Sequence, residues 1–369
     1  MKIVLAFDSF KGAVSAAQAV EAAARGVLDA MPEATVVRRP MADGGEGTSE
    51  ILCDLFNADT VSCASHDALM RPLTVSYGYD AVSRTAILES ASAAGITLLT
   101  EAERTPMTSS SFGVGEMLAD AVDRGAQRII IGIGGIVTAD CGMGMFAALG
   151  VRFTDADGRF LAPCGANLQH IAAIDRSGML DLGGVAIDVV NDVDNPLYGP
   201  NGSPRVYGPQ KGATPANVEA LEAGFRHFAS LCTVDPATPG AGAAGGLGYA
   251  FLLLGGKLRR GSQFMLDTAR FDDLLAGADL VITGEGKIDR QTLCGKLPLA
   301  VMQRARARGV PCIALAGAVE HADELRRAGF ADVLCINPDP TAPDCMQPAV
   351  AIRNIRNTIQ TLINQLKQS

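Results

Sequence analysis

Acidic side chains stand directly after several apolar, strand-like stretches of this chain. They are Asp8, Asp43, Glu89, Asp140, Asp192 and Glu285, and three lysines stand near them in sequence, Lys11, Lys211 and Lys287. Ligands of open α/β sheets gather outside the carboxyl ends of the strands. Phosphoryl transfer needs a carboxylate that holds Mg²⁺, another that orients or deprotonates the attacking hydroxyl, and cations that neutralise charge. A single acid at such a place caps a helix more often than it catalyses, so the recurrence of the pattern is what favours a phosphotransferase.

Glycine loops supply the remaining part of such a site. The apolar run 129–131 predicts a buried strand that meets a glycine turn and then a helix. Backbone N–H groups at the start of a helix bind anions, so we expect phosphate contacts from Gly134 and Gly135. Thr138 and Asp140 either cap that helix or help to hold the phosphate and its metal. A second glycine cluster predicted to contact phosphate contains Gly240, Gly242 and Gly245.

Two common nucleotide motifs are absent. The Walker A pattern fails because Gly256-Lys257, Gly286-Lys287 and Gly295-Lys296 lack the upstream glycine. A G-x-G-x-x-G sequence begins at Gly240, but Pro236 and Pro239 stand where the preceding strand is required. These observations exclude a P-loop kinase and argue against a Rossmann dehydrogenase.

Composition limits the class of protein further. The 369 residues are 48% apolar, and the net charge of −9 comes without a long basic cluster, which argues against nucleic-acid and anionic-membrane binding. Nine cysteines occur without a C-x-x-C pair, which suits free thiols in a reducing cytosol. The first residues predict a strand and not a signal peptide, and no apolar run reaches the length of a membrane span. We therefore expect a soluble cytoplasmic enzyme.

Hydrophobic periodicity predicts an α/β fold. The helix that starts near Ser15 carries a capping box with Gln18. Strands are expected at 2–7, 35–39, 73–79, 85–88, 129–131, 185–190, 279–283 and 312–316, and helices at 15–31, 49–56, 214–232 and 349–368. The length favours two α/β domains. We expect a Rossmann-like parallel sheet built from residues 1–83 and 280–369, and an inserted α/β domain of residues 84–279.

Seven motifs, in the same order along the chain, resemble those of the bacterial class I glycerate kinases. They are Asp8–Gly12, Met41–Thr48, Gly132–Gly135, Asp192–Leu197, Tyr207–Ala213, Pro239–Gly246 and Thr283–Asp289. The resemblance implies two α/β domains with the active site in the cleft between them. It also implies transfer of the ATP γ-phosphate to D-glycerate, at the 2-hydroxyl, with Mg²⁺. It implies ATP and a small hydroxy acid as partners. A homodimer is one assembly that the sequence allows, and the sequence does not choose the oligomeric state.

Roles follow for the matching residues. Asp43 and Asp192 are the candidates for general base or metal ligand, and spacing does not choose between them. Glu285 is the other candidate metal ligand, and Lys11 and Lys287 are candidates for charge neutralisation. The predicted substrate contacts are Asp8, Ser9, Arg205 and Lys211, the last two as alternative partners of the acid's carboxylate.

The chain departs from the family pattern at Phe7, where the family has a proline, and at five positions in or beside two of the later motifs. They are Ile136, Ala139 and Cys141 in the glycine loop, and Asn191 and Asp194 beside Asp192. Ile136 replaces a hydroxyl and Ala139 an amide that could bond to phosphate or to the acid. An alternative hypothesis is therefore a catalytically impaired or re-specified relative that binds a nucleotide or another small hydroxy acid.

Overall fold

The computed structural model describes residues 1–45, 47–342 and 344–367, and these form two compact units. Unit 1 combines both ends of the chain, Met1–Ile51 and Gly261–Ser369, and unit 2 is Leu52–Arg260. The chain passes from one unit to the other after residues 51 and 260, whereas the expected domain boundaries fell after residues 83 and 279. The first boundary comes earlier than expected because β3 (Asp59–His66) and β4 (Pro72–Asp80) pair and extend the sheet of unit 2.

Unit 1 is built on the predicted parallel sheet. Its strand order is β13-β12-β11-β1-β2, and every adjacent pair is parallel. The strands are β1 (Lys2–Phe7), β2 (Thr35–Arg38), β11 (Leu280–Ile288), β12 (Cys312–Val319) and β13 (Asp332–Cys335). All five carboxyl ends therefore lie at one edge of the sheet, which is the edge where α/β folds bind ligands.

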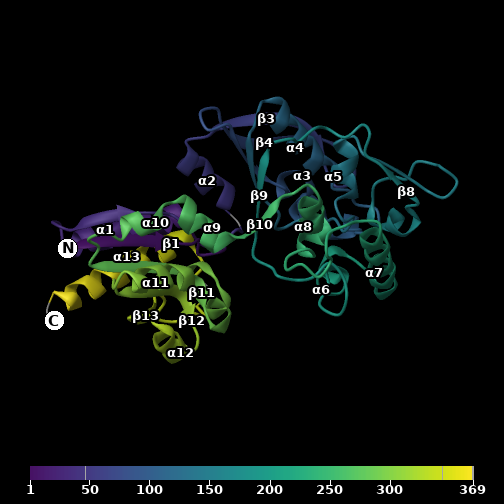
Figure 1. Cartoon of the computed structure of the whole chain (residues 1–369). Coiled ribbons are helices and arrows are strands. Elements are labelled where there is room, and N and C mark those ends of the chain that lie inside the picture. Colours follow the sequence, from purple (N-terminus) through teal and green to yellow (C-terminus); the bar gives the residue numbers. More distant parts are fainter. Residues whose placement is uncertain (46, 343, 368–369) are drawn as a thin grey trace. The chain divides into compact units, whose positions relative to one another are not determined.

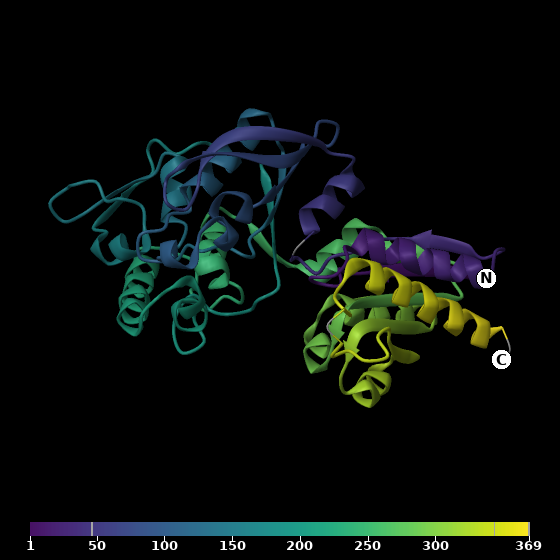
Figure 2. The ribbon, with the colours of Figure 1, turned by 180° about the vertical axis from the view of Figure 1, so that it is seen from behind.

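Helices cover both faces of this sheet. They are α1 (Ala16–Ala30), α9 (Gly261–Thr268), α10 (Phe271–Leu274), η5 (Arg290–Cys294), α11 (Leu297–Ala307), α12 (Ala322–Ala328) and α13 (Pro348–Leu366). Helices α1 and α13 lie side by side on one face, and α11 lies on the other (Figures 1 and 2). Gly26 of α1 permits this packing, since a Cβ there would stand 2.4 Å from the Arg356 carbonyl oxygen of α13.

Local signals in the sequence account for several of these elements. Ser15 accepts from the Gln18 amide and the Gln18 side chain accepts from the Ser15 amide, so the predicted capping box opens α1. Alternate residues of β1, β11 and β12 join α1 and α13 in one apolar cluster that includes Leu5, Ile282 and Leu315. Strand β11 is longer than predicted, so Glu285 and Lys287 belong to a strand and not to a loop.

Unit 2 contains a six-stranded mixed sheet in the order β10-β9-β6-β5-β4-β3. Its further strands are β5 (Thr85–Glu89), β6 (Arg128–Gly132), β9 (Ala186–Asn191) and β10 (Lys257–Arg260), while β7 (Arg152–Thr154) and β8 (Ala173–Asp175) pair separately. The predicted strands at 73–79 and 85–88 are present as β4 and β5, and the two strands pair antiparallel. Strand β3 is not among the predicted elements.

The helices of unit 2 pack around its sheet and carry the glycine loops. They are α3 (Ala91–Ala94), η1 (Ile96–Leu98), η2 (Glu101–Glu103), α4 (Phe112–Asp123), α5 (Met143–Ala148), η3 (Gly165–His170), α6 (Ser203–Tyr207), η4 (Pro209–Lys211), α7 (Pro215–Ser230) and α8 (Ala243–Leu253). Helix α2 (Thr48–Phe56) contains the first crossing between the units. The predicted strand, glycine turn and helix appear as β6, the loop 133–142 and α5.

Candidate active site

Asp8 directly follows β1 and is a buried carboxyl group in a charged neighbourhood. Its side chain accepts a 2.6 Å hydrogen bond from the Ser9 amide, and the residue is 2% exposed. Burial raises the pKa of Asp8 to about 7, and the nearby charge of Asp43 adds to the rise. A carboxyl group with a pKa near neutrality can both take up and release a proton at the pH of the cell.

Asp43 lies close to Asp8, although the two residues are far apart in sequence. Its carboxylate accepts from the Gly45 amide at 3.1 Å and lies 3.9 Å from the Lys11 ammonium. Two parallel strands explain the meeting, since β1 pairs with β2 and both deliver their following residues to one edge. Asp8, Lys11 and Asp43 therefore lie near one another at this edge, and their roles in the site stay predictions.

The tip of β11 brings a third carboxylate to this edge. Glu285 is buried, accepts from the Thr292 hydroxyl at 2.7 Å, and lies 3.4 Å from the Lys296 ammonium. Burial raises the pKa of Glu285, while Lys296 opposes that shift. Lys287 lies two residues farther along the strand and pairs with Glu320 at 2.9 Å and Asp289 at 3.6 Å.

Lys296 is a site residue that the sequence analysis does not single out. In the sequence, the pair Gly295-Lys296 is notable only as an incomplete Walker A motif that lacks the upstream glycine. Its position one residue before α11 was a usable signal, because a lysine at a loop-to-helix junction beside a strand end lies near the ligand edge of an α/β sheet.

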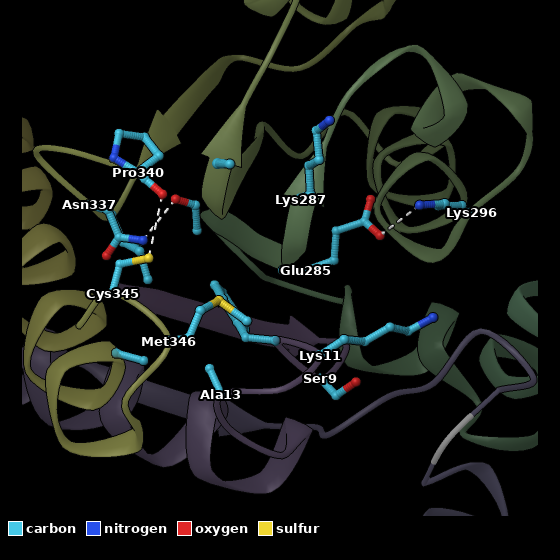
Figure 3. Close-up of a pocket in the computed structure, with 16 residues that line it drawn as sticks. Ser9, Lys11, Ala13, Glu285, Lys287, Lys296, Asn337, Pro340, Cys345 and Met346 are labelled. Carbon is cyan, nitrogen blue, oxygen red and sulfur yellow. Dashed lines mark hydrogen bonds and ion pairs between the residues drawn. The ribbon is translucent and has the colours of Figure 1, made fainter. Parts of the chain in front are cut away.

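Ser9, Lys11, Glu285, Lys287 and Lys296 line a pocket within unit 1. Its volume is about 290 Å³. One end has the polar side chains of Ser9, Lys11, Glu285, Lys287 and Lys296, and the other has Asn337, Pro340, Cys345 and Met346 (Figure 3). The pocket thus joins a charged end to a mainly apolar one, as small-molecule sites commonly do.

The glycine loop of unit 2 has a different character. Asp140 is buried, and its carboxylate accepts from the Ser111 amide and hydroxyl, both at 2.8 Å, and from the amides of Gly142 and Gly144. This set of donors fixes the loop at the start of α5. Asp140 therefore has a structural role here, in place of the predicted contact with phosphate or its metal.

Lys211 is also directed into the protein. It is 4% exposed and donates a 2.7 Å hydrogen bond to the Thr138 carbonyl oxygen. Burial lowers the pKa of Lys211 to about 8, and the charge of Asp140 opposes this shift. Thr138 is itself fully buried. Neither Thr138 nor Lys211 therefore presents its side chain to a substrate in this structure, contrary to the prediction.

The second glycine cluster packs against the first. Gly245 has a φ of +65°, and a Cβ there would stand 2.0 Å from the Thr138 carbonyl oxygen. The Gly245 carbonyl oxygen accepts from the Cys141 amide at 3.1 Å. Gly240, with a φ of +83°, and Gly242 are buried in similarly close backbone contacts. Close packing between loops accounts for these three glycines, and a phosphate contact is not needed to explain them.

The remaining predicted residues of unit 2 lie at its surface. Gly134 and Gly135 are exposed, as is Asp192. Arg205 pairs with Glu219 through two hydrogen bonds of 2.8 and 3.0 Å, so its guanidinium has a partner within the fold. The predicted roles of Gly134, Gly135 and Asp192, and the expected cleft between the domains, stay predictions.

The two α/β units and the cluster of carboxylates and lysines at a strand edge define an enzyme of the phosphotransferase type. The model of the glycerate kinase family matches residues 3–367. The chain therefore belongs to the glycerate kinase family and is a kinase.

Individual relatives agree with this assignment. The chain is 42% identical to the glycerate kinase of Bacillus subtilis strain 168 over 326 residues, covering 86% of this chain and 85% of the relative. It is 39% identical to the glycerate 2-kinase of Escherichia coli K12, covering 86% of each. A crystal structure of a putative glycerate kinase 2 from Salmonella typhimurium LT2 superposes with a TM-score of 0.87 at 38% identity, covering 100% of this chain and 98% of that one.

Within the part of the chain that the structure describes, no helix combines the length and the apolar character needed to cross a membrane.

Proposed function

We propose that this kinase transfers the γ-phosphate of ATP to the 2-hydroxyl of D-glycerate and releases 2-phosphoglycerate and ADP. Membership of the glycerate kinase family supports the acceptor. The observation that carries the proposal is the cluster of Asp8, Asp43, Lys11 and Lys287 at the carboxyl edge of the parallel sheet. It contains the parts that phosphoryl transfer requires from a protein, namely a proton acceptor and cations.

Asp8 and Asp43 are proposed to act together on the attacking hydroxyl. Burial and the nearby Asp43 charge raise the pKa of Asp8 to about 7, so the Asp8 carboxyl can take up a proton near neutral pH. The ionised member of the pair accepts the proton as the hydroxyl oxygen attacks phosphorus. Lys11 and Lys287 then balance the negative charge on the transferring phosphoryl oxygens.

Mg²⁺ fits the donors at this edge. No group of three or more acidic, histidine or cysteine side chains among the described residues is arranged to hold a metal ion alone. Mg²⁺ usually binds through one or two carboxylates, with phosphate and water oxygens completing its shell. Asp43 and Glu285 supply suitable oxygens, and the ion would neutralise the phosphate chain beside this excess of carboxylates. Asp192, the other predicted ligand, belongs to unit 2.

The departures from the family pattern do not favour the impaired or re-specified alternative. Ile136, Ala139 and Cys141 belong to the apolar core of unit 2, each at most 4% exposed. The Asn191 side chain accepts from the Val193 amide at 2.7 Å, and Asp194 pairs with Arg260. Each altered residue therefore has a packing or hydrogen-bonding role of its own.

Turnover of purified protein tests the proposal. ADP release is measured with ATP, Mg²⁺ and D-glycerate, with L-glycerate and D-lactate as alternative acceptors. ³¹P NMR of the product distinguishes the 2-phosphate from the 3-phosphate. We expect D-glycerate to be preferred and to give the 2-phosphate. Absence of turnover with all three acids, while ADP still binds, would support the impaired alternative. Homodimer formation and cytoplasmic location stay predictions from the sequence.

A further inference from the structure

The pocket of unit 1 has two ends of opposite character. The charged end contains Lys11, Lys287 and Lys296, with the buried Glu285 between strand and helix. The apolar end is formed by Ala13 after β1, Ile336 after β13, Ala351 of α13, and the side chains of Pro340 and Met346. Figure 3 shows the lysines and Asn337 on opposite sides of this space.

The charged end contains a hydroxyl without a partner. The Ser9 oxygen is buried and makes no hydrogen bond to any described residue. A buried hydroxyl without a hydrogen bond destabilises the folded protein unless a ligand or a water molecule forms a hydrogen bond with it. Ser9 also lines the pocket, next to the lysines. A ligand with acceptor oxygens, such as a phosphate chain, would satisfy both the hydroxyl and the cations.

The apolar end is held in place by a fixed amide. Asn337 donates to the Gly317 carbonyl oxygen at 2.8 Å and accepts from the Asn354 amide at 2.9 Å. The Met346 methyl group lies over Gly12, where a Cβ would be 3.2 Å away. Strand β13 ends at Cys335 while β12 continues from Ala316 to Val319, so the backbone of β12 extends past its neighbour beside the pocket.

We propose that this pocket binds the adenosine part of ATP and ADP, with the phosphate chain directed toward Lys11, Lys287 and Lys296. The inference rests on the proposed function and adds the location of the nucleotide. A planar heterocycle suits apolar walls with a few fixed polar groups, and phosphates suit lysines. D-glycerate has no apolar surface to bury, so the apolar end does not suit the acceptor acid.

Filling the apolar end tests the base position. Ala13→Phe places a ring in the pocket, and Ala307→Phe on the exposed surface of α11 is the matched control. Calorimetry with adenosine and with ADP should show binding weakened at least about tenfold by Ala13→Phe and unchanged by the control. Met346→Trp is a second obstruction that lies outside the apolar core, and it should act in the same direction. If both Ala13→Phe and Met346→Trp fold normally and keep the wild-type affinity for adenosine, the proposal is overturned.

Removing a cation tests the direction of the phosphates. Lys287→Gln should weaken ADP binding about tenfold because a charged contact is lost, while adenosine affinity stays within about twofold. Equal weakening of adenosine and ADP would contradict the proposed orientation.

Protection of Cys345 gives a readout that is independent of turnover. Cys345 lines the pocket, whereas Cys232 lies in unit 2 and serves as the internal reference. Peptide mass spectrometry after brief iodoacetamide treatment should show ADP slowing the alkylation of Cys345 but not of Cys232. Unchanged labelling of Cys345 at saturating ADP would count against the site.

These results separate failure of the site from failure of the function. If wild-type protein turns over ATP and D-glycerate but Ala13→Phe keeps the wild-type KM for ATP, the nucleotide binds elsewhere and the kinase assignment stands. If wild-type protein binds neither ADP nor ATP, both the pocket assignment and the proposed reaction are wrong.

Discussion

Asp8 lies buried near Asp43, and burial together with the Asp43 charge raises the pKa of the Asp8 carboxyl to about 7. The pair is formed by two parallel strands, β1 and β2, whose following residues meet at one edge of the sheet. Because the Asp43 charge contributes to the raised pKa of Asp8, removal of that charge should be measurable as a change in the titration of Asp8.

The pH dependence of turnover should report this pair. We expect kcat/KM to rise with pH toward a plateau above about 7, since the ionised pair accepts the hydroxyl proton. In Asp43→Asn the residual activity should reach its plateau at lower pH, because the like charge that raises the Asp8 pKa is gone. An unchanged midpoint in Asp43→Asn would mean that another group controls the profile.

Stability should depend on Asp8 with a defined sign. The folded state keeps the Asp8 proton up to about pH 7, whereas the unfolded chain releases it near 3.8. Asp8 therefore contributes its full stabilisation to the folded state below pH 3.8, and this contribution is lost as pH rises through about 7. Urea unfolding of wild type and Asp8→Asn at pH 5 and pH 8 measures this. The variant should gain stability relative to wild type at the higher pH, and a constant difference at both pH values would refute the assignment.

Substitution of the two candidate bases should distinguish them. Removing a general base commonly costs 10²–10⁴-fold in rate, so we expect Asp43→Asn to lower kcat by about that factor. Asp192→Asn should have a smaller effect if Asp8 and Asp43 form the proton-accepting pair. Circular dichroism controls for folding, and a larger kcat loss in Asp192→Asn would make Asp192 the base.

Two glycines predicted to bind phosphate should respond differently to a methyl group. Gly245→Ala combines a φ of +65° with a 2.0 Å clash, and we expect a loss on the order of 3 kcal/mol in unfolding free energy. Gly134→Ala meets no atom within 4 Å and should change stability by less than about 1 kcal/mol. Urea denaturation measures both. Reduced activity of a stable Gly134→Ala would then support the predicted phosphate contact of that turn.

Lys211 should make stability depend on alkaline pH. Its folded pKa is about 8 while the unfolded value is 10.5, so the unfolded chain binds the proton more tightly between these values. The contribution of Lys211 to stability is present above 10.5 and is lost as pH falls through about 8. Stability of wild type should therefore increase relative to Lys211→Met between pH 8 and 10. Parallel unfolding curves across this range would indicate that Lys211 keeps its charge when buried.

The sequence by itself determined where several helices and strands begin, and which polar residues follow the strands. Ser15 and Gln18 fix the start of α1 through a local hydrogen-bonded cap, and the apolar run of residues 129–131 defines β6. A parallel sheet places its carboxyl ends at one edge, so the convergence of Asp8, Lys11 and Asp43 followed from strand direction alone. The family resemblance also followed from motif order.

Only the tertiary structure decided which acidic and basic side chains are free to contact a ligand and which are buried in the fold. Asp140 and Lys211 have the same sequence signature as Asp43 and Lys11, yet they are buried and bonded within unit 2. Burial depends on packing between residues far apart in the chain, which local patterns do not encode. The wall formed by Asn337 and Met346, and the pairing of Lys296 with Glu285, arise in the same way from contacts between separate elements.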